Sequence, residues 1–311
     1  MAQETRNAYG LELAKLIVED KNVVVLDADL TKSTKTIEAK KACPQRHFNA
    51  GIAECNMMGM AAGLAASGKT VFASSFAVFA TGRAFEIIRN SICYPKLNVK
   101  ICATHAGLAV GEDGASHQAI EDIGIMRTLP NMRVYVPCDQ YEAQAVVRHI
   151  AKIDGPCYAR FGRGKVDDVF TPKTKFNLDK INVLHKGKKL VIFATGLMVQ
   201  ETLKALPTLK KNGIDPTIVN VTCLKPIDAK GITKLLESHK YAITCEEHNI
   251  FGGLFTAISE VKAKTNIKTS ITPIAINDTF GESGKMLDVL NAYGMNAKNI
   301  IKTAKKVVKT K

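Results

Sequence analysis

The stretch Phe48-Asn49-Ala50-Gly51-Ile52-Ala53-Glu54-Cys55-Asn56-Met57-Met58-Gly59-Met60-Ala61-Ala62-Gly63 places one carboxylate at the start of an apolar helix of small residues. A glutamate in a first helical turn usually complements the helix dipole from solvent. Because the residues around Glu54 are so apolar, we expect its side chain to be buried, and the nearby sequence offers it no cationic partner. Buried carboxyl groups tend to hold a proton, which suits an enzyme that protonates or polarises a ring nitrogen.

Length and composition indicate a globular protein of two domains. The chain has 311 residues, of which 46% are hydrophobic and 23% charged. Charged residues interrupt every long apolar stretch, so we predict no membrane span, and the first residues lack the pattern of a signal peptide. The eight cysteines have no CxxC pair, which favours reduced thiols in the cytoplasm over a disulfide framework or a zinc site.

The chain is strongly basic, with 43 Lys and Arg against 29 Asp and Glu and a net charge of +14. Six lysines and no acid lie between Lys298 and Lys311, spaced as in an amphipathic surface helix. Such a charge is compatible with nucleic acid, an acidic partner or anionic substrates. Aromatic residues are only 6% of the chain and do not interleave with the basic ones, so we predict a solvated surface and no nucleic-acid binding.

Short apolar runs alternate with longer helical stretches along the chain. Continuous apolar strands separated by helices indicate parallel sheets covered on both faces, so we predict two consecutive α/β domains with mostly parallel sheets. The predicted strands are 22–26, 70–73, 99–103, 133–136, 190–194, 216–221, 241–244 and 270–276, with a further strand ending near Tyr158. The predicted helices are 52–66, 79–90, 139–150, 199–210, 228–238 and one that begins at Gly253.

The alternation stops between Gly162 and Lys186, where the chain is polar, aperiodic and contains Pro172. We predict a linker there. The resulting division is a first domain over 1–165, a linker over 166–186 and a second domain over 187–311.

The run Gly63-Leu64-Ala65-Ala66-Ser67-Gly68-Lys69-Thr70 matches the Walker A pattern. A phosphate-binding loop of that kind follows a strand and opens a helix. Here the glycines end the helix that begins near Ile52, and Thr70 opens a strand. We therefore predict a helix C-cap at Gly68 and no nucleotide site.

Polar or aromatic side chains follow four predicted strands, at the edge where ligands bind in open α/β sheets. Each run has an ordinary interpretation as well: the glycine-rich run could be a surface turn, and the phenylalanines could be core. Together the runs predict a site for an anionic substrate, with arginines suited to phosphate. The runs are Asp27–Ser33, Ser74–Phe79, Thr104–Gln118 and Tyr158–Arg163.

With these residues assembled, the chain resembles the C-terminal half of a transketolase over its whole length. The resemblance rests on Gly-Ile-Ala-Glu at 51–54, Ser-Ser-Phe-Ala-Val-Phe at 74–79 and Gly-Glu-Asp-Gly-Ala-Ser-His-Gln at 111–118. Asp-Ala-Asp-Leu at 27–30 and Arg160 agree with it. The resemblance implies a thiamine-diphosphate pyrimidine-binding fold followed by a transketolase C-terminal domain.

The resemblance also implies the cofactor thiamine diphosphate with a divalent metal such as Mg, and transfer of a two-carbon ketol unit from a ketose phosphate to an aldose phosphate. Glu54 would bind the aminopyrimidine ring and His117 would act near the reacting carbons. Stacking on the pyrimidine would come from Phe79, with Phe76 beside it, and Asp29 and Leu30 would border the cofactor. The substrate would be held by Arg6, Ser33, His105, Asp113 and Arg160.

Two departures from the family pattern affect these assignments. The segment from Phe76 to Arg89 is one residue longer than in many transketolases, which leaves open which phenylalanine stacks. The sequence Ala-Arg-Phe-Gly-Arg at 159–163 replaces Ser-Arg-Gln, so Arg163 could share the phosphate role with Arg160.

The family holds the cofactor diphosphate and metal through a Gly-Asp-Gly motif on its N-terminal half, and these 311 residues contain no Gly-Asp-Gly. The resemblance therefore implies a split enzyme, active only with a separate N-terminal subunit and assembled symmetrically from two copies of each chain. No metal ligand is assigned to this chain. We expect a cytoplasmic enzyme of the pentose phosphate pathway.

Three alternatives remain open from the sequence. A 2-oxo acid dehydrogenase β subunit would share the Gly-Ile-Ala-Glu helix, although we would not expect it to carry Gly-Glu-Asp-Gly with a following Ser-His-Gln. A deoxyxylulose phosphate synthase-like protein is the second alternative. The third is a regulatory or nucleic-acid-binding relative without catalysis.

Overall fold

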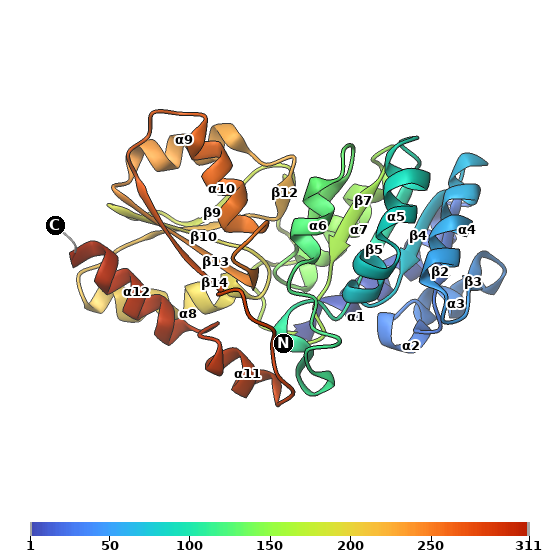
Figure 1. The fold of residues 1–311 in the computed structure, drawn as a ribbon, viewed down its shortest axis with the longest axis horizontal. Helices are drawn as coiled ribbons and strands as arrows, with labels where there is room; N and C mark the ends of the chain where they lie inside the picture. Colours follow the sequence, from blue (N-terminus) through green and yellow to red (C-terminus); the bar gives the residue numbers. More distant parts are fainter. Residues whose placement is uncertain (1, 310–311) are drawn as a thin grey trace.

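The computed structural model describes residues 2–309, which form two α/β units side by side (Figure 1). Each unit is built around its own central sheet, and both sheets are mostly parallel. The predicted fold class is thereby confirmed.

The first sheet has seven strands in the order β12-β6-β7-β5-β4-β2-β3, and each neighbouring pair is parallel except β12 with β6. Strands β2, β4, β5 and β7 are buried along their whole length, as expected of strands covered on both faces. The bounds are β2 Val23–Asp27, β3 His47–Asn49, β4 Thr70–Ser74, β5 Val99–Ala103, β6 Arg133–Tyr135, β7 Cys157–Arg160 and β12 Cys223–Lys225.

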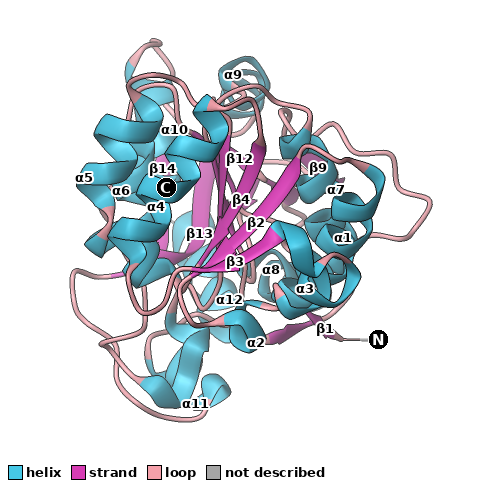
Figure 2. Ribbon diagram, turned by 90° about the vertical axis from the view of Figure 1, so that its right-hand side faces the viewer, coloured by secondary structure: helices cyan, strands magenta, loops and turns pink. Residues whose placement is uncertain are grey.

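Helices cover both faces of this sheet (Figure 2). One face packs against α4 (Glu54–Ala66), the helical segment 79–93 that includes α5 (Phe85–Ile87), and α6 (Asp122–Thr128). The other face packs against α1, α3 and α7 through a core that contains Tyr9 and Leu13. The bounds of these helices and of the short α2 are α1 Thr5–Glu19, α2 Thr31–Thr34, α3 Ile37–Ala42 and α7 Gln140–Ala151.

The second sheet has the order β14-β13-β10-β11-β9 and is parallel except for β9 against β11. Helices α9 and α10 lie on one face, and α8 and α12 lie on the other (Figure 1). The bounds are β9 Asn182–His185, β10 Leu190–Ala194, β11 Thr217–Asn220, β13 Tyr241–Asn249, β14 Ser270–Ile276, α8 Met198–Lys211, α9 Ala229–Ser238, α10 Leu254–Ala263, α11 Met286–Ala292 and α12 Ala297–Lys309.

Three short strands lie in or near the predicted linker and the junction of the two units, and one of them, β12, joins the second unit to the first sheet. Strand β8 (Lys165–Val166) pairs with β1 (Gln3–Glu4). Strand β9 lies inside the segment predicted as linker and forms an edge of the second sheet. Strand β12 follows β11 but crosses back, pairing Cys223 with Tyr135 at the edge of the first sheet. Sequence periodicity missed β9 and β12 because four and three residues are too few to show an alternating pattern.

The Walker-like run has the structure predicted for it. Helix α4 ends at Ala66, Gly68 takes the left-handed conformation with a φ of 86°, and β4 begins at Thr70. The run is therefore a helix end followed by a strand, which is the reverse of a phosphate-binding loop.

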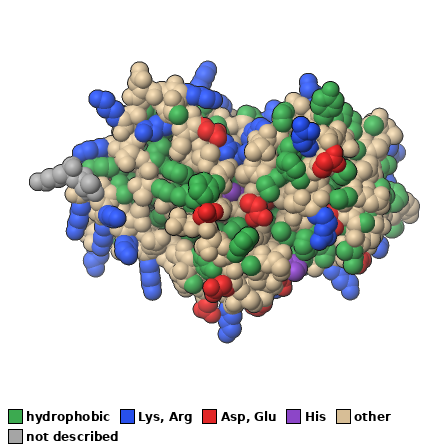
Figure 3. All heavy atoms as spheres, viewed as in Figure 1, with side chains coloured by type: hydrophobic (Ala, Val, Ile, Leu, Met, Phe, Trp, Pro, Cys, Tyr) green, Lys and Arg blue, Asp and Glu red, His purple; other side chains and the backbone are tan. Residues whose placement is uncertain are grey.

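The basic C-terminal segment forms α12, an amphipathic helix that buries Ile300 and Ala304 and packs on α8. Its lysines belong to the fringe of basic side chains at this end of the molecule (Figure 3). Residue 311, the last lysine of the predicted run, lies outside the described residues. Within residues 2–309, the structure contains no helix that is both long and apolar enough to span a bilayer.

Candidate active site

The four polar runs predicted from the sequence meet at one edge of the first sheet. They follow β2, β4, β5 and β7, which are neighbours in the order β7-β5-β4-β2. Because these strands are parallel, their carboxyl ends lie at the same edge, where side chains can converge on a ligand.

Two phenylalanines and two histidines form an aromatic wall at this edge. The ring of Phe76 stacks on that of His105, with centroids 3.7 Å apart, and lies 6.0 Å from the ring of Phe79. The ring of His117 meets both phenylalanines edge-on, at 6.0 Å from Phe76 and 5.3 Å from Phe79. Phe76 is buried, whereas Phe79 is half-buried. His105 covers one face of Phe76, and Phe79, which has the Arg83 guanidinium over its ring, is the more exposed of the two phenylalanines.

The helical segment that carries Phe79 contains wide turns. Residues Phe79–Arg83 and Ile88–Cys93 are π-helical, on either side of α5. A π turn takes up more residues than an α turn and is often found at functional sites. This geometry places Arg83 beside Phe79.

Glu54 is buried, as predicted, with 2% of its surface exposed at the first position of α4. The prediction that it has no cationic partner was wrong. The Arg83 guanidinium lies 2.8 Å from Glu54 Oε2 and 4.8 Å from the centroid of the Phe79 ring. Arg83 is 29 positions away in the sequence, so local inspection around Glu54 could not find this ion pair.

Arg6, Ser33 and His105 come together from three separate segments. Arg6 donates one hydrogen bond to the Ser33 carbonyl and one to His105 Nε2, both at 3.0 Å. Because Nε2 accepts, Nδ1 carries the proton of a neutral ring, and it lies 2.8 Å from Thr104 Oγ1. Burial, followed by the charge of Arg6, lowers the pKa of His105 to about 3, so this ring stays neutral at physiological pH.

Two further basic residues are close enough to His105 for their charges to affect its pKa. Arg163 and Lys35 both contribute to the lowered pKa of His105, after burial and Arg6. Arg163 is half-buried and lies 3.0 Å from the Glu112 carboxylate. The sequence had indicated Arg163 as a second phosphate ligand, but it did not single out Lys35, whose signal was its position two residues after Ser33. The cluster is well suited to a phosphate or another terminal anion.

Arg160 does not join this cluster, although the sequence placed it there. It is buried, its Nε lies 2.8 Å from Asp122 Oδ2, and its Nη2 donates to the carbonyls of Ala119 and Glu247. Its guanidinium therefore has partners on several sides, one of them from the second unit. The sequence correctly placed Arg160 at the end of a strand. Its side chain points toward Asp122, whose position beside it could not be inferred from the sequence.

Asp29 and Leu30 border the same edge, at the end of β2. Asp29 is exposed and has a φ of 62°, and Leu30 is half-buried. The side chain of Asn49, on the neighbouring β3, accepts hydrogen bonds from the backbone N–H groups of Asp29 and Gly51. Asn49 was missed by the sequence analysis. It links the Asp29 turn to the chain that leads into Glu54.

The run Thr104–Gln118, here called the glycine-rich loop, carries Asp113 and His117. A 3₁₀ segment, Leu108–Asp113, follows Gly107, and Asp113 is exposed at its end. The Gly107 N–H donates to the Ala119 carbonyl, which closes the loop at its base. His117 returns to the aromatic wall, so the loop presents a carboxylate and an imidazole at the same edge as Glu54.

The residues present fit the ring of thiamine diphosphate better than its diphosphate. The Glu54 carboxylate and the Phe79 ring together bind a flat cation, the Arg83 guanidinium. An aminopyrimidine would use the same two groups, one as a hydrogen-bond partner and the other as a stacking surface. Within residues 2–309, no group of three or more His, Cys, Asp or Glu side chains could hold a metal ion.

Comparisons with known proteins agree with this geometry. Residues 1–168 match the family model of the transketolase pyrimidine-binding domain, and residues 179–300 match that of the transketolase C-terminal domain. A Methanocaldococcus jannaschii protein provisionally named a transketolase C-terminal section is 50% identical over 299 residues, which cover 96% of this chain and 94% of that protein.

A 6-deoxy-6-sulfo-D-fructose transketolase subunit of a Clostridium species is 33% identical over 306 residues, covering 98% of this chain and 95% of that subunit. Among solved structures, an inactive β4 tetramer of a split-gene transketolase superposes with a TM-score of 0.90 at 45% identity, covering 99% of both chains. The chain therefore belongs to the transketolase family, as the C-terminal subunit of a split, thiamine-diphosphate-dependent transketolase.

Proposed function

We propose that this subunit, together with a separate N-terminal subunit, transfers a two-carbon ketol unit from a ketose phosphate to an aldose phosphate in the pentose phosphate pathway. The observation that carries the proposal is the convergence of Glu54, Phe79 and His117 at one sheet edge, next to the cationic cluster around Arg6. A carboxylate, a ring surface, an imidazole and an anion site are the parts that this reaction requires of this half of the enzyme.

When bound, thiamine diphosphate supplies the carbanion that breaks and forms the carbon–carbon bonds. Glu54 would hold the pyrimidine ring through a hydrogen bond, while Phe79 would stack against it. His117, at the edge of the aromatic wall, would exchange a proton with a substrate hydroxyl, and Asp113 would accept a hydrogen bond from another. Arg6 with Arg163 and Lys35 would bind the substrate phosphate, since His105 is neutral.

The proposal includes a partner that supplies the diphosphate and metal ligands, with Mg as the metal. It also includes a cytoplasmic assembly of two copies of each chain. Its support is the lack of a metal-binding group among residues 2–309 and of Gly-Asp-Gly in the sequence. The eight cysteines, all within the described residues, are free thiols, which suits a reducing compartment.

The cationic cluster does not by itself select a phosphate over another terminal anion. A relative in this family is named for 6-deoxy-6-sulfo-D-fructose, a ketose that ends in a sulfonate. Such a donor would use the same arginines, because both groups are tetrahedral anions. We therefore propose xylulose 5-phosphate as the first donor to test and the sulfonated ketose as the second.

The test is an assay of ketol transfer from xylulose 5-phosphate to ribose 5-phosphate with thiamine diphosphate and Mg. The chain is assayed alone and then mixed with the candidate subunit that carries Gly-Asp-Gly. We expect activity only in the mixture. A stable complex that transfers no ketol unit from either donor would contradict the proposal and favour another thiamine-dependent reaction.

A further inference from the structure

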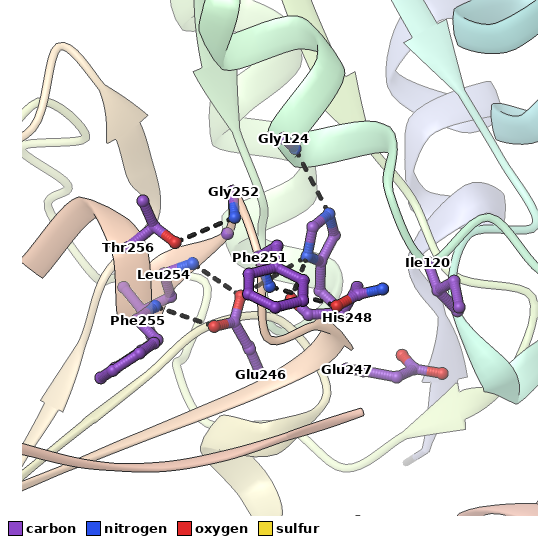
Figure 4. Close-up of polar contacts among 12 residues, drawn as sticks. Ile120, Gly124, Glu246, Glu247, His248, Phe251, Gly252, Leu254, Phe255 and Thr256 are labelled. Carbon is purple, nitrogen blue, oxygen red and sulfur yellow. Dashed lines mark hydrogen bonds and ion pairs between the residues drawn. The ribbon is translucent and has the colours of Figure 1, made fainter. Parts of the chain in front are cut away.

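Three consecutive residues near the end of β13 contact three different elements, and Figure 4 shows the contacts of two of them, Glu246 and His248. Glu246 accepts hydrogen bonds from the N–H groups of Leu254 and Phe255, at 2.6 and 2.8 Å, and so caps α10 within the second unit. His248 Nε2 accepts a hydrogen bond from the Gly124 N–H of α6, at 3.3 Å. Glu247, between them, reaches the base of the glycine-rich loop.

The contacts of Glu247 are specific to that loop. Its Oε1 accepts a hydrogen bond from the Ala109 N–H, in the first turn of the 3₁₀ segment that ends at Asp113. Gly107 has a φ of 78°, and a Cβ built on it would lie 2.4 Å from the Glu247 carboxyl carbon. A glycine is therefore required where the carboxylate meets the loop, for its conformation and for space.

Arg160 completes the base of the loop. Its Nη2 donates to the backbone carbonyl of Glu247 and to the carbonyl of Ala119, the residue that closes the loop on Gly107. Glu247 is buried, with 5% of the residue exposed, so its side chain has little freedom to move. The base of the loop is thus held on one side by a carboxylate of the second unit and on the other by an arginine that contacts the same residue. Further along the loop, Ser283 Oγ donates to the Glu112 carbonyl, and Arg163 contacts Val110 and Glu112.

We propose that Glu247 is a positioning residue for substrate binding: acting from the second unit, it holds the glycine-rich loop so that Asp113 is placed for the sugar. This inference rests on the proposed function, and it gives the C-terminal domain a direct part in the site. His117 is held separately by its contacts with Phe76 and Phe79. Loosening the base of the loop should therefore affect substrate binding more than turnover.

The matched variants are Glu247→Ala and Glu246→Ala in the full chain, the second as a control for the loss of a neighbouring buried carboxylate. In the assembled enzyme we expect Glu247→Ala to raise the KM for the ketose phosphate roughly tenfold, with kcat changed much less. Glu246→Ala should leave that KM near the wild-type value. Glu247→Gln keeps an oxygen that can accept from Ala109 and should restore most of the affinity.

A second measurement does not depend on activity. Hydrogen–deuterium exchange of the full chain should show faster exchange of amides 107–114 in Glu247→Ala and in Gly107→Ala, but not in Glu246→Ala. An unchanged rate in those amides would overturn the inference, as would equal KM values in the two alanine variants. If no ketol transfer is found with any donor, the proposed function fails, while the exchange result still decides whether Glu247 holds the glycine-rich loop.

Discussion

Arg83 and Glu54 form an ion pair in which the carboxylate side chain is 2% exposed and the guanidinium side chain 52% exposed. One partner is fixed in the core, while the other can move into solvent at little cost. The same guanidinium lies over the Phe79 ring. The Arg83 side chain therefore contacts both groups that are suited to a pyrimidine ring, the Glu54 carboxylate and the Phe79 ring.

Replacing Arg83 by methionine should therefore tighten binding of thiamine diphosphate to the assembled two-subunit enzyme. The ion pair and the ring contact together stabilise the arrangement without cofactor, in which Arg83 contacts Glu54 and Phe79, by about 1 kcal/mol. Removing them corresponds to roughly a fivefold change in the Kd of the cofactor. Titration calorimetry of the assembled enzyme measures this directly. Arg89→Met, an exposed site on the same helical segment, is the control. Weaker binding in Arg83→Met would show that the guanidinium holds the cofactor instead.

Glu54→Gln should lower kcat of the assembled enzyme by about 100-fold or more, because it removes an ionisable proton at the ring with almost no change in volume. Size-exclusion chromatography should show an unaltered complex. Glu86→Gln changes an exposed carboxylate of α5 and should leave both properties unchanged. Normal turnover in Glu54→Gln would refute the assigned role.

The two arginines at the end of β7 should give opposite results. Arg160→Met leaves the buried Asp122 carboxylate without its cationic partner, with only the hydrogen bond from Tyr158, and should lower the free energy of unfolding by about 3–5 kcal/mol, measured by urea denaturation. Arg163→Met should change stability little but raise the KM for a phosphorylated donor about tenfold, since a charged hydrogen bond to the substrate is lost. A KM effect confined to Arg160→Met would contradict this division of roles.

Glu142 predicts a pH dependence of stability. It accepts hydrogen bonds from Cys138 N–H, Asn220 and Thr222, and burial raises its pKa to about 7 despite these bonds. Between pH 4.5, the ordinary pKa of a glutamate, and about pH 7, the folded chain keeps a proton on Glu142 that the unfolded chain has released. The free energy of unfolding contributed by this group therefore falls as the pH rises through that interval, by up to about 3 kcal/mol.

Glu142→Gln should flatten that part of the stability profile, measured by urea denaturation between pH 5 and pH 8. Burial also raises the pKa of Glu246 and Glu247 to about 7, but both remain in the variant, so the difference between the two profiles isolates Glu142. Glu237→Gln, at an exposed position of α9, provides the control. Parallel profiles for wild type and Glu142→Gln would rule out the assignment.

The sequence predicted the features that depend on neighbours along the chain. The apolar strands, the burial of Glu54 and the end of α4 at the Walker-like run all follow from local patterns. The pairing of Glu54 with Arg83 and the burial of Arg160 depend on packing between distant segments, which no window of sequence contains. Glu247 was missed for the same reason: its loop partner lies 138 positions earlier.

Strand β12 belongs to the second unit by its place in the chain but to the first sheet by its hydrogen bonds. In the chain it follows β9, β10 and β11 of the second sheet, yet it covers the β6 edge of the first sheet. A fragment that stopped before residue 223 would leave that edge open to pairing with other chains, with aggregation as the expected result. Exchange of the second unit between relatives is likewise constrained, because each incoming unit must bring a strand that matches β6. The two units are thus joined through backbone hydrogen bonds of one sheet as well as through side-chain contacts between them.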